Sequence, residues 1–322
     1  MAKAKSLKAR FKSIQNTRKI TKAMEMVAAS KMKRVIDRAL KTREYTQTAW
    51  EILTKTTSSI DIQNPLLDIR KVERICIVMI TSNKGLCGGL NSQLVKKVFE
   101  NVESPYNMMI NRTRGIKILP DSNKSDLDVD FISIGKKGRD EIVKAKKNLV
   151  ASFTDLNDQS GILDLKPVAK MIIDGYEAKK YDKVIVAYTD FISTVVSKPR
   201  LRQVLPISTK DLERQLEELG KGIAYESEMD EVKEDVYNRY YTFEPDAEKI
   251  LEKILPQVVE SQIYQAFLES QASEFSARMI TMKNASDTAK EMLESLNFQY
   301  NQARQAAITA ELAEISAGMA VL

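Results

Sequence analysis

Side chains that could carry out chemistry gather in one short glycine-rich stretch of this 322-residue chain. An apolar run from Arg74 to Thr81 precedes a GLCGG turn at residues 85–89, and a helical pattern follows through Val102. Such a turn between a strand and a helix can cradle a phosphate. The spacing fits neither the dinucleotide fingerprint nor a P-loop, because no Gly-Lys-Ser/Thr follows. The glycines therefore favour a tight turn over a nucleotide site.

The chain lacks the residues that most enzymes use as bases and metal ligands. It has no histidine, which is the commonest general base and metal ligand. Its two cysteines, Cys76 and Cys87, give neither a disulfide framework nor a metal-ligand set. Without a histidine to activate it, Cys87 is expected to be a buried small side chain rather than a nucleophile. We therefore expect no catalytic residue, no metal site and no cofactor.

Charge is distributed unevenly along the chain. Residues 1–58 carry fifteen Lys or Arg against four Asp or Glu, a net charge of +11, whereas the whole chain is only +6. Residues 208–236 carry ten acidic and four basic side chains, a net charge of −6. A basic helix can bind nucleic acid, a membrane surface or an acidic protein surface. This charge favours a binding partner over a helix face exposed to solvent alone. The chain contains no run of eighteen apolar residues, so no membrane span is expected.

A long helix is expected at the start of the chain. From Ala4 to about Ser58 there is neither Pro nor Gly, and apolar residues recur every three or four positions, with slips near Thr17 and Lys31. The expected apolar positions in its first half are Leu7, Phe11, Ile14, Ile20, Met24 and Val27. At 1.5 Å per residue this helix would be about 80 Å long. A small domain cannot wrap such a helix, so coiled-coil pairing is expected.

A second long helix is expected at the end of the chain. It begins near Glu244-Pro245, where the missing N–H of proline costs nothing, and runs to about Ala317 with Pro256 inside it. Its apolar positions form one stripe of Leu296, Tyr300, Ala303 and Ala307, and another of Ile308, Leu312, Ile315 and Met319. The change of stripe rotates the apolar face by about 100°. The tip of the helix is therefore expected to contact a different partner from the one that the preceding stripe contacts.

Strand and helix patterns alternate between the two long helices, which predicts a small open α/β sheet. Strands are expected at 74–81, 108–110, 129–134, 150–153, 183–188 and 194–196, and helices from the turn to 102, at 137–147 and at 166–180. Pro199 argues against a long final strand. The expected parts are an N-terminal helix at 1–60, an α/β domain at 72–207, an acidic insertion and foot at 208–243, and a C-terminal helix at 244–322.

Several segments resemble the gamma subunit family of F-type ATP synthases. Residues 13–32 (SIQNTRKITKAMEMVAASKM) are similar to the first helix of that family, and residues 81–91 (TSNKGLCGGLN) to its first strand, turn and helix. Residues 277–285 (ARMITMKNA) and 300–309 (YNQARQAAIT), followed by the tail ELAEI, resemble its last helix. These segments are long and specific, and they stand in the family's order.

The resemblance implies a rotor shaft that performs no chemistry itself. Its fold would be a long antiparallel coiled coil of the N- and C-terminal helices with an inserted open, Rossmann-like α/β domain. The coiled coil would lie inside the catalytic alpha–beta hexamer, and the α/β domain at the foot, against the epsilon subunit and the membrane c ring. Proton flow would turn the ring, and the shaft would drive ATP synthesis. The implied location is peripheral, on the cytoplasmic face of a bacterial inner membrane, without direct membrane insertion.

The resemblance also assigns contact residues. Contacts with the alpha and beta subunits fall on Lys22, Met24, Arg278, Arg304, Gln305, Thr309 and Glu311. Contacts with the c ring and epsilon fall on Tyr241, Phe243 and Glu244. Residues 103–127 and 208–236 are longer than in shorter bacterial members. The second segment contains no cysteine, which excludes the thiol switch of chloroplast members, and it is expected to be exposed and dispensable for rotation.

Two other function classes stay open on the residues alone. A basic helical arm with an α/β body could bind nucleic acid, with an affinity that falls steeply with salt. Against it, no aromatic set is interleaved with the basic residues of the first helix, where Phe11 stands alone before Tyr45. A Rossmann-like enzyme is the second alternative, and the missing phosphate-binding spacing and the missing histidine count against it.

Overall fold

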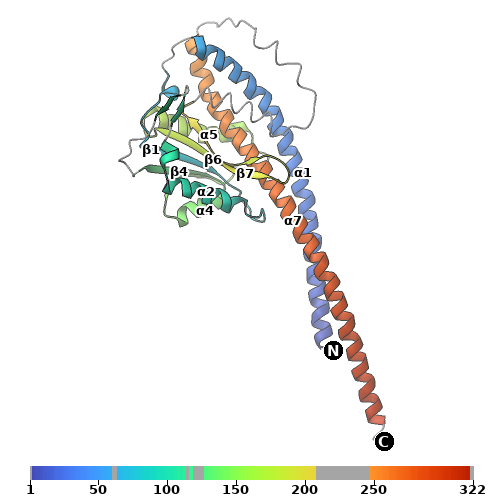
Figure 1. Ribbon diagram of the computed structural model, residues 1–322. Coiled ribbons are helices and arrows are strands. Elements are labelled where there is room, and N and C mark those ends of the chain that lie inside the picture. Colours follow the sequence, from blue (N-terminus) through green and yellow to red (C-terminus); the bar gives the residue numbers. More distant parts are fainter. Residues whose placement is uncertain are drawn as a thin grey trace. The chain divides into compact units, whose positions relative to one another are not determined.

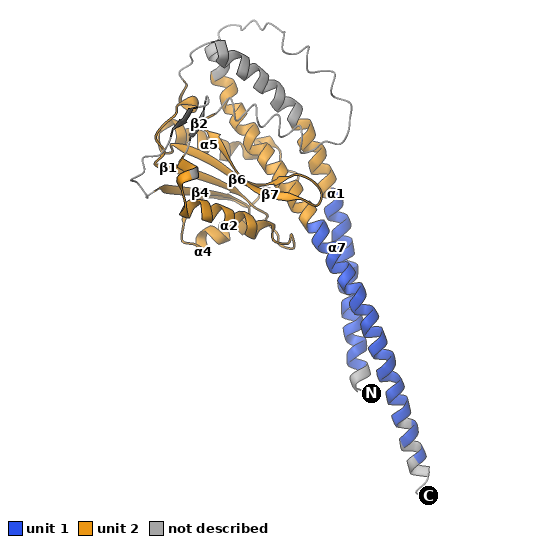
Figure 2. Ribbon diagram, viewed as in Figure 1, with its two compact units in different colours: residues 1–30, 278–322 blue, residues 31–277 orange. Residues whose placement is uncertain are grey.

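The computed structural model describes residues 2–59, 64–109, 111–113, 116–118, 127–207 and 247–319. These residues divide into two compact units (Figure 2). One unit contains residues 1–30 and 278–322, and we call it the helical unit. The other contains residues 31–277, and we call it the body.

Two long helices contribute residues to both units. Helix α1 is Ala2–Ser59 and helix α7 is Ala247–Met319, which confirms the helices expected at the two ends of the chain (Figure 1). Helix α7 continues through Pro256. In the helical unit the N and C termini lie at the same end, so the two segments run in opposite directions (Figure 2).

Buried positions in the helical unit follow a repeat of seven residues. In α1 the least exposed side chains before residue 31 include Leu7, Phe11, Ile14, Thr21 and Ala28. In α7 the corresponding side chains are Met282, Ser286, Ala289, Leu293, Leu296, Tyr300, Ala303 and Ala307, separated by alternating steps of four and three. This spacing keeps one narrow face of each helix covered. The apolar stripe expected from Leu296 to Ala307 is therefore confirmed.

The expected apolar face of α1 is wrong at two positions. Ile20 and Val27 are 60% and 56% exposed, and their neighbours Thr21 and Ala28 are buried instead. After Ile14, the large apolar side chains Ile20 and Val27 stand one position before the covered positions of the seven-residue repeat. Small side chains on the covered face let a neighbouring helix approach closely, so burial here follows helix geometry rather than hydrophobicity.

The body contains a five-stranded sheet in the order β5-β4-β1-β6-β7. Its strands are β1 (Arg74–Ile80), β4 (Asp128–Ile134), β5 (Asn148–Phe153), β6 (Lys183–Phe191) and β7 (Ser197–Leu205). The first four are parallel to their neighbours, and β7 is antiparallel to β6. A separate two-stranded sheet pairs β2 (Asn111–Thr113) with β3 (Ile116–Ile118). The open α/β sheet is confirmed.

Helices cover both faces of this sheet (Figure 1). The body helices are α2 (Leu90–Glu103), α3 (Tyr106–Met109), α4 (Lys136–Lys144) and α5 (Ile162–Glu177), with a short 3₁₀ turn η1 (Pro65–Leu67). Along β1, Ile77 belongs to the core shared with α2 and α4, whereas Val78 belongs to the core shared with α5 and α7. A strand covered on both faces has no polar side, which explains the continuous apolar run in its sequence.

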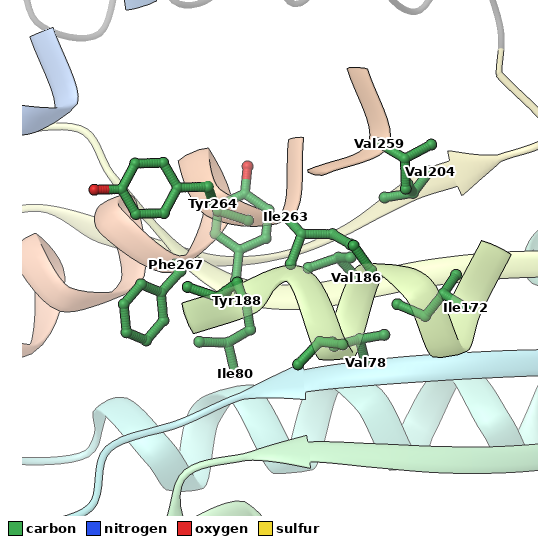
Figure 3. Close-up of a cluster of buried hydrophobic side chains, with 14 of the residues drawn as sticks. Val78, Ile80, Ile172, Val186, Tyr188, Val204, Val259, Ile263, Tyr264 and Phe267 are labelled. Carbon is green, nitrogen blue, oxygen red and sulfur yellow. The ribbon is translucent and has the colours of Figure 1, made fainter. Parts of the chain in front are cut away.

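Helix α7 is part of the hydrophobic core of the body. Figure 3 shows side chains from β1, β6, β7, α5 and α7 in one cluster. The labelled members are Val78, Ile80, Ile172, Val186, Tyr188, Val204, Val259, Ile263, Tyr264 and Phe267. Nearly every α7 side chain from 258 to 276 is buried, including polar ones. The body therefore cannot fold to this structure without the C-terminal helix.

Two expected strands are wrong. Residues 106–109 form α3, where a strand was expected at 108–110. Residues 194–196 form the turn between β6 and β7, held by two backbone bonds to the carbonyl of Val196. The final strand then passes through Pro199, which pairs with Thr189. Because β7 lies at the edge of the sheet, a proline there need not remove a ladder hydrogen bond.

Burial controls the chemistry of Cys76, which lies in the core beside β4. Burial, and next the charge of Asp130, raises the pKa of the Cys76 thiol to about 12. The thiol is therefore neutral in the folded chain at pH 8, and unfolding returns its pKa toward the ordinary value of 9.0. A Cys87→Ala chain should react with a thiol reagent at pH 8 only at the rate of unfolding, because the thiolate is the nucleophile. Labelling as fast as in urea would contradict this expectation.

The raised pKa of Cys76 predicts that the folded chain loses stability at alkaline pH. The Cys76 pKa is raised above its ordinary value of 9.0, so the unfolded state releases a proton first. The stabilisation is fully present below pH 9 and is lost as the pH rises toward 12, with a slope of up to about 1.4 kcal/mol per pH unit. Urea unfolding at pH 9 to 11 measures this slope, and Cys76→Ala should reduce it by one proton's contribution.

Candidate functional site: the exposed surface of the helical unit

The expected contact residues of α1 lie on the helical unit. Lys22 is exposed, and its Nζ lies 3.0 Å from Oε2 of Glu25. Met24 is half-buried and lies within one turn of the buried residues Thr21 and Ala28. Its side chain therefore sits at the border between the covered face and the exposed surface. A larger or charged side chain at Met24 would change the exposed surface of the helix pair.

The expected contact residues near the end of α7 share one exposed stretch. Arg304, Gln305 and Thr309 are all exposed, and the hydroxyl of Thr309 donates to the carbonyl of Gln305 at 3.0 Å. This stretch presents hydrogen-bonding groups within less than two helical turns. Such groups can bind a polar loop of another protein, and Arg304 can bind a carboxylate with two parallel hydrogen bonds.

The other expected contact residues do not join this stretch. Arg278 is only 9% exposed, so the chain itself covers most of its side chain. Glu311 lies on α7, but its side chain is outside the described part. Tyr241, Phe243 and Glu244 lie outside the described residues, as does the acidic segment 208–236.

The second apolar stripe of α7 is exposed where it is described. Ile308 and Leu312 are 49% and 61% exposed, directly after the covered stripe ends at Ala307. The side chains of Ile315 and Met319 are outside the described part. Exposed apolar side chains at the tip of a helix lack a partner within the described chain. This supports the expectation that the tip binds a surface of another protein.

Further exposed apolar residues of the helical unit were missed by sequence reasoning. They are Ile20, Met26 and Val27 on α1, and Met292 and Phe298 on α7, with Phe298 reaching 71% exposure. The signal that could have identified them is their position outside the seven-residue repeat. Apolar side chains that the helix pair does not cover mark candidate contact positions, because water disfavours their exposure.

The charge of the α1 surface is almost entirely positive. Glu25 is the only acidic residue among residues 2–30, and Lys22 neutralises it. The other described basic side chains of this segment are all exposed, and they are Lys5, Lys8, Arg10, Lys12, Arg18 and Lys19. A basic surface interrupted by Ile20, Met26 and Val27 fits an acidic protein surface that also offers apolar contacts.

The glycine-rich segment of the body forms a tight turn, as its sequence indicated. Asn91 donates to the Ser82 hydroxyl at 2.7 Å, and that hydroxyl donates to the carbonyl of Lys84 at 2.7 Å. Leu86 and Gly88 take positive φ angles of 65° and 60°. The side chains of Ser82 and Asn91 are thus bonded within this segment. Among the described residues, no group of three acidic or cysteine side chains could hold a metal ion.

Comparison with known proteins gives this surface a context. The family model described as ATP synthase matches residues 3–322. The ATP synthase gamma chain of Herpetosiphon aurantiacus is 37% identical over 331 residues, covering 100% of this chain and 99% of that protein. The gamma chain of Dehalococcoides mccartyi strain 195 is 37% identical over 325 residues, covering 100% of both chains. The chain belongs to the ATP synthase gamma chain family.

Solved structures of ATP synthases share the fold of this gamma chain family member. A chain of the Euglena gracilis mitochondrial ATP synthase matches with a TM-score of 0.64 and 19% identity, covering 99% of this chain and 94% of that one. A chain of the Tetrahymena thermophila central stalk and c ring matches with a TM-score of 0.53 and 24% identity, covering 83% of this chain and 99% of that one. Both show likeness of fold alone.

The curated gamma chains also bear on the two longer segments. Because the alignments cover nearly all of both proteins, these relatives are about as long as this chain. Segments 103–127 and 208–236 are therefore extra only against shorter members. Within the described residues, no helix combines the length and apolar character that a membrane crossing requires.

Proposed function

We propose that this chain is the central rotor stalk of an F-type ATP synthase, a subunit without catalytic residues of its own. It transmits the rotation of a membrane c ring to a catalytic alpha–beta hexamer, and proton flow drives ATP synthesis. The observation that carries this proposal is the full-length match to curated gamma chains at up to 37% identity. The exposed, partly apolar surface of the helical unit supports it.

The helical unit is proposed to be an antiparallel coiled coil that enters the hexamer. Support comes from the seven-residue repeat of covered positions in both helices and from their opposite directions. On this surface, Lys22, Met24 and the Arg304–Thr309 stretch are proposed to contact the alpha and beta subunits. The tip beyond Ala307 is proposed to occupy an apolar bearing, because its described apolar side chains are exposed.

The body is proposed to lie at the foot of the stalk, against the epsilon subunit and the c ring. Tyr241, Phe243 and Glu244 are proposed to contact the ring, and the acidic segment 208–236 to be a surface loop that is dispensable for rotation. The chain would then be peripheral on the cytoplasmic face of a bacterial inner membrane. No observation in the described residues or in the comparisons favours the nucleic-acid-binding alternative.

Met24→Lys tests this function at the surface of the helical unit. Met24 is half-buried in a helix that is already strongly basic, so a lysine places another cation where the shaft turns against fixed partners. We expect the assembled complex to form, while the number of protons pumped per ATP hydrolysed falls at least about threefold. The measurement is acidification of membrane vesicles together with ATP hydrolysis.

The control adds a lysine to the body. Met171 on α5 is 37% exposed, and Met171→Lys should leave the proton-to-ATP ratio unchanged. If alpha, beta and epsilon subunits do not co-purify with the unmodified chain, the rotor proposal is wrong. If the complex assembles and Met24→Lys pumps normally, Met24 has no part in coupling.

A further inference from the structure

The loop between β5 and α5, residues 154–161, is bonded to helix α1 within the body. Oδ1 of Asp158 accepts a hydrogen bond from Nζ of Lys31 at 3.0 Å. The backbone carbonyl of the same residue accepts from the guanidinium of Arg38. Lys31 and Arg38 are seven residues apart, about two turns along one face of α1. Two side chains of α1, about two turns apart, therefore bond to the same residue of this loop.

The same loop is bonded to helix α7. Nε2 of Gln271, a buried side chain, donates to the carbonyl of Asn157 at 2.8 Å. The ammonium of Lys31 also lies 5.6 Å from the ring centre of Phe275 on α7, within the range of a cation–π contact. Lys31 thus touches both the loop and the second helix. The 154–161 loop joins both long helices at neighbouring residues.

The loop is itself fixed to the sheet. Nδ2 of Asn83 donates to the carbonyl of Leu156 at 2.9 Å, while Oδ1 of Asn83 accepts from the backbone of Lys136 at 3.0 Å. Inside the loop, the backbone N–H of Asn157 donates to the hydroxyl of Ser160 at 3.0 Å. These bonds connect the ends of β1 and β4 to the residues that hold the helices, so the loop is a short rigid link.

Hydrogen bonds in this loop can fix the position of a helix more tightly than apolar packing can. Apolar packing is non-directional, so a helix that shifts along or about its axis can regain many of the same contacts. A hydrogen bond tolerates only a narrow range of distance and angle. The bonds at Asp158 therefore define one position of residues 31–38 of α1 against the loop. Helix α7 is held by the bond at Asn157 and also by its own bonds to the sheet, such as that from the Ser273 hydroxyl to the carbonyl of Thr189 at 3.0 Å.

We propose that Asp158 is a positioning residue for torque transmission, and that through Lys31 and Arg38 it holds the part of α1 that belongs to the body in one position against the 154–161 loop. This proposal rests on the proposed rotor function. A force on the sheet would otherwise let residues 31–38 of α1 slide along this loop. With Asp158 in place, residues 31–38 of α1 turn with the sheet under load.

Two measurements test this role separately. The first needs no ATP synthase activity: amide hydrogen exchange of residues 31–42 in the free full-length chain. Asp158→Asn removes the carboxylate charge and should speed exchange there by at least about threefold. The control is Asp140→Asn, because the Asp140 carboxylate is also paired with a cationic side chain, that of Arg139, but Asp140 is an exposed residue of α4. It should leave exchange at 31–42 unchanged.

The second measurement uses the complete complex in vesicles, with ATP-driven proton pumping against an increasing opposing gradient. Asp158→Asn should assemble and hydrolyse ATP like the unmodified chain, but its proton-to-ATP ratio should fall by about threefold at high opposing gradient. Exchanging the charges, with Lys31→Asp and Asp158→Lys together, should restore the ratio that each single change loses. A purely structural role would lower complex yield and pumping in proportion and at every gradient.

The outcomes distinguish this proposal from the rotor function. Normal pumping by Asp158→Asn at high gradient, in a complex where the unmodified chain pumps, would overturn the positioning role alone. Exchange at 31–42 that matches the Asp140→Asn control would also overturn it. If the unmodified chain forms no pumping complex, the rotor function fails, and the exchange measurement still decides whether Asp158 holds α1 in place.

Discussion

Gly135→Ala is expected to lower the free energy of unfolding by about 4 kcal/mol or more, enough to unfold much of a marginally stable chain. Gly135 has φ 98° and ψ 150°, a region that is essentially restricted to glycine. An added Cβ would also lie 2.2 Å from the backbone carbonyl oxygen of Thr81. That oxygen belongs to the segment following β1 and cannot move without disturbing the sheet. Backbone strain and steric overlap of the added Cβ with the Thr81 oxygen therefore both destabilise the variant.

Urea unfolding followed by circular dichroism measures this loss. Gly85→Ala is the matched control, because an added Cβ there meets nothing within 4 Å and Gly85 has no positive φ. Its effect should stay within about 0.5 kcal/mol. A Gly135→Ala chain as stable as the Gly85→Ala chain would show that the segment after β4 can adopt another conformation.

Glu269→Ala is expected to destabilise the body by about 3–5 kcal/mol, because it leaves a buried guanidinium without its partner. Oε2 of Glu269 lies 3.9 Å from the guanidinium of Arg202, and the two side chains are 3% and 13% exposed. Oε1 of Glu269 accepts from Gln265 at 3.0 Å. Burial raises the pKa of the Glu269 carboxyl, while the charge of Arg202 opposes that shift.

Replacing both partners separates the loss of the pair from the cost of an unpaired charge. Glu269→Met with Arg202→Met should recover most of the stability that Glu269→Ala loses, because buried ion pairs are often no better than apolar packing of similar volume. Urea midpoints at unchanged dependence on denaturant measure the difference. A double variant as unstable as Glu269→Ala would mean that the pair itself, rather than the orphaned charge, stabilises the body.

Small side chains take the place of larger apolar neighbours at two positions on the covered face of α1 in the helical unit. Hydrophobicity placed Ile20 and Val27 on that face, but the seven-residue repeat buries Thr21 and Ala28. Ile20 and Val27 were missed as exposed contact candidates because hydrophobicity placed them on the covered face. A count of steps from Leu7 would have identified them, because two long helices bury positions according to geometry.

The sequence by itself determined the two long helices, the open sheet and the family. Helix α1 contains neither glycine nor proline, and α7 contains only Pro256 and, next to its end, Gly318. Together with apolar periodicity, these are local signals of a long helix. The alternation of strands and helices is local as well. The match to gamma chains rests on extended motifs whose order the whole chain preserves.

Only the tertiary structure decided which polar residues hold the parts together. Asp158 and Lys31 are 127 residues apart, and Arg202 and Glu269 meet only because β7 and α7 pack in one core. A surface charge and a buried charge look the same in a sequence. Pro199 shows the same limit: whether a proline ends a strand depends on whether that strand lies at the edge of the sheet, which is fixed by the order of all five strands.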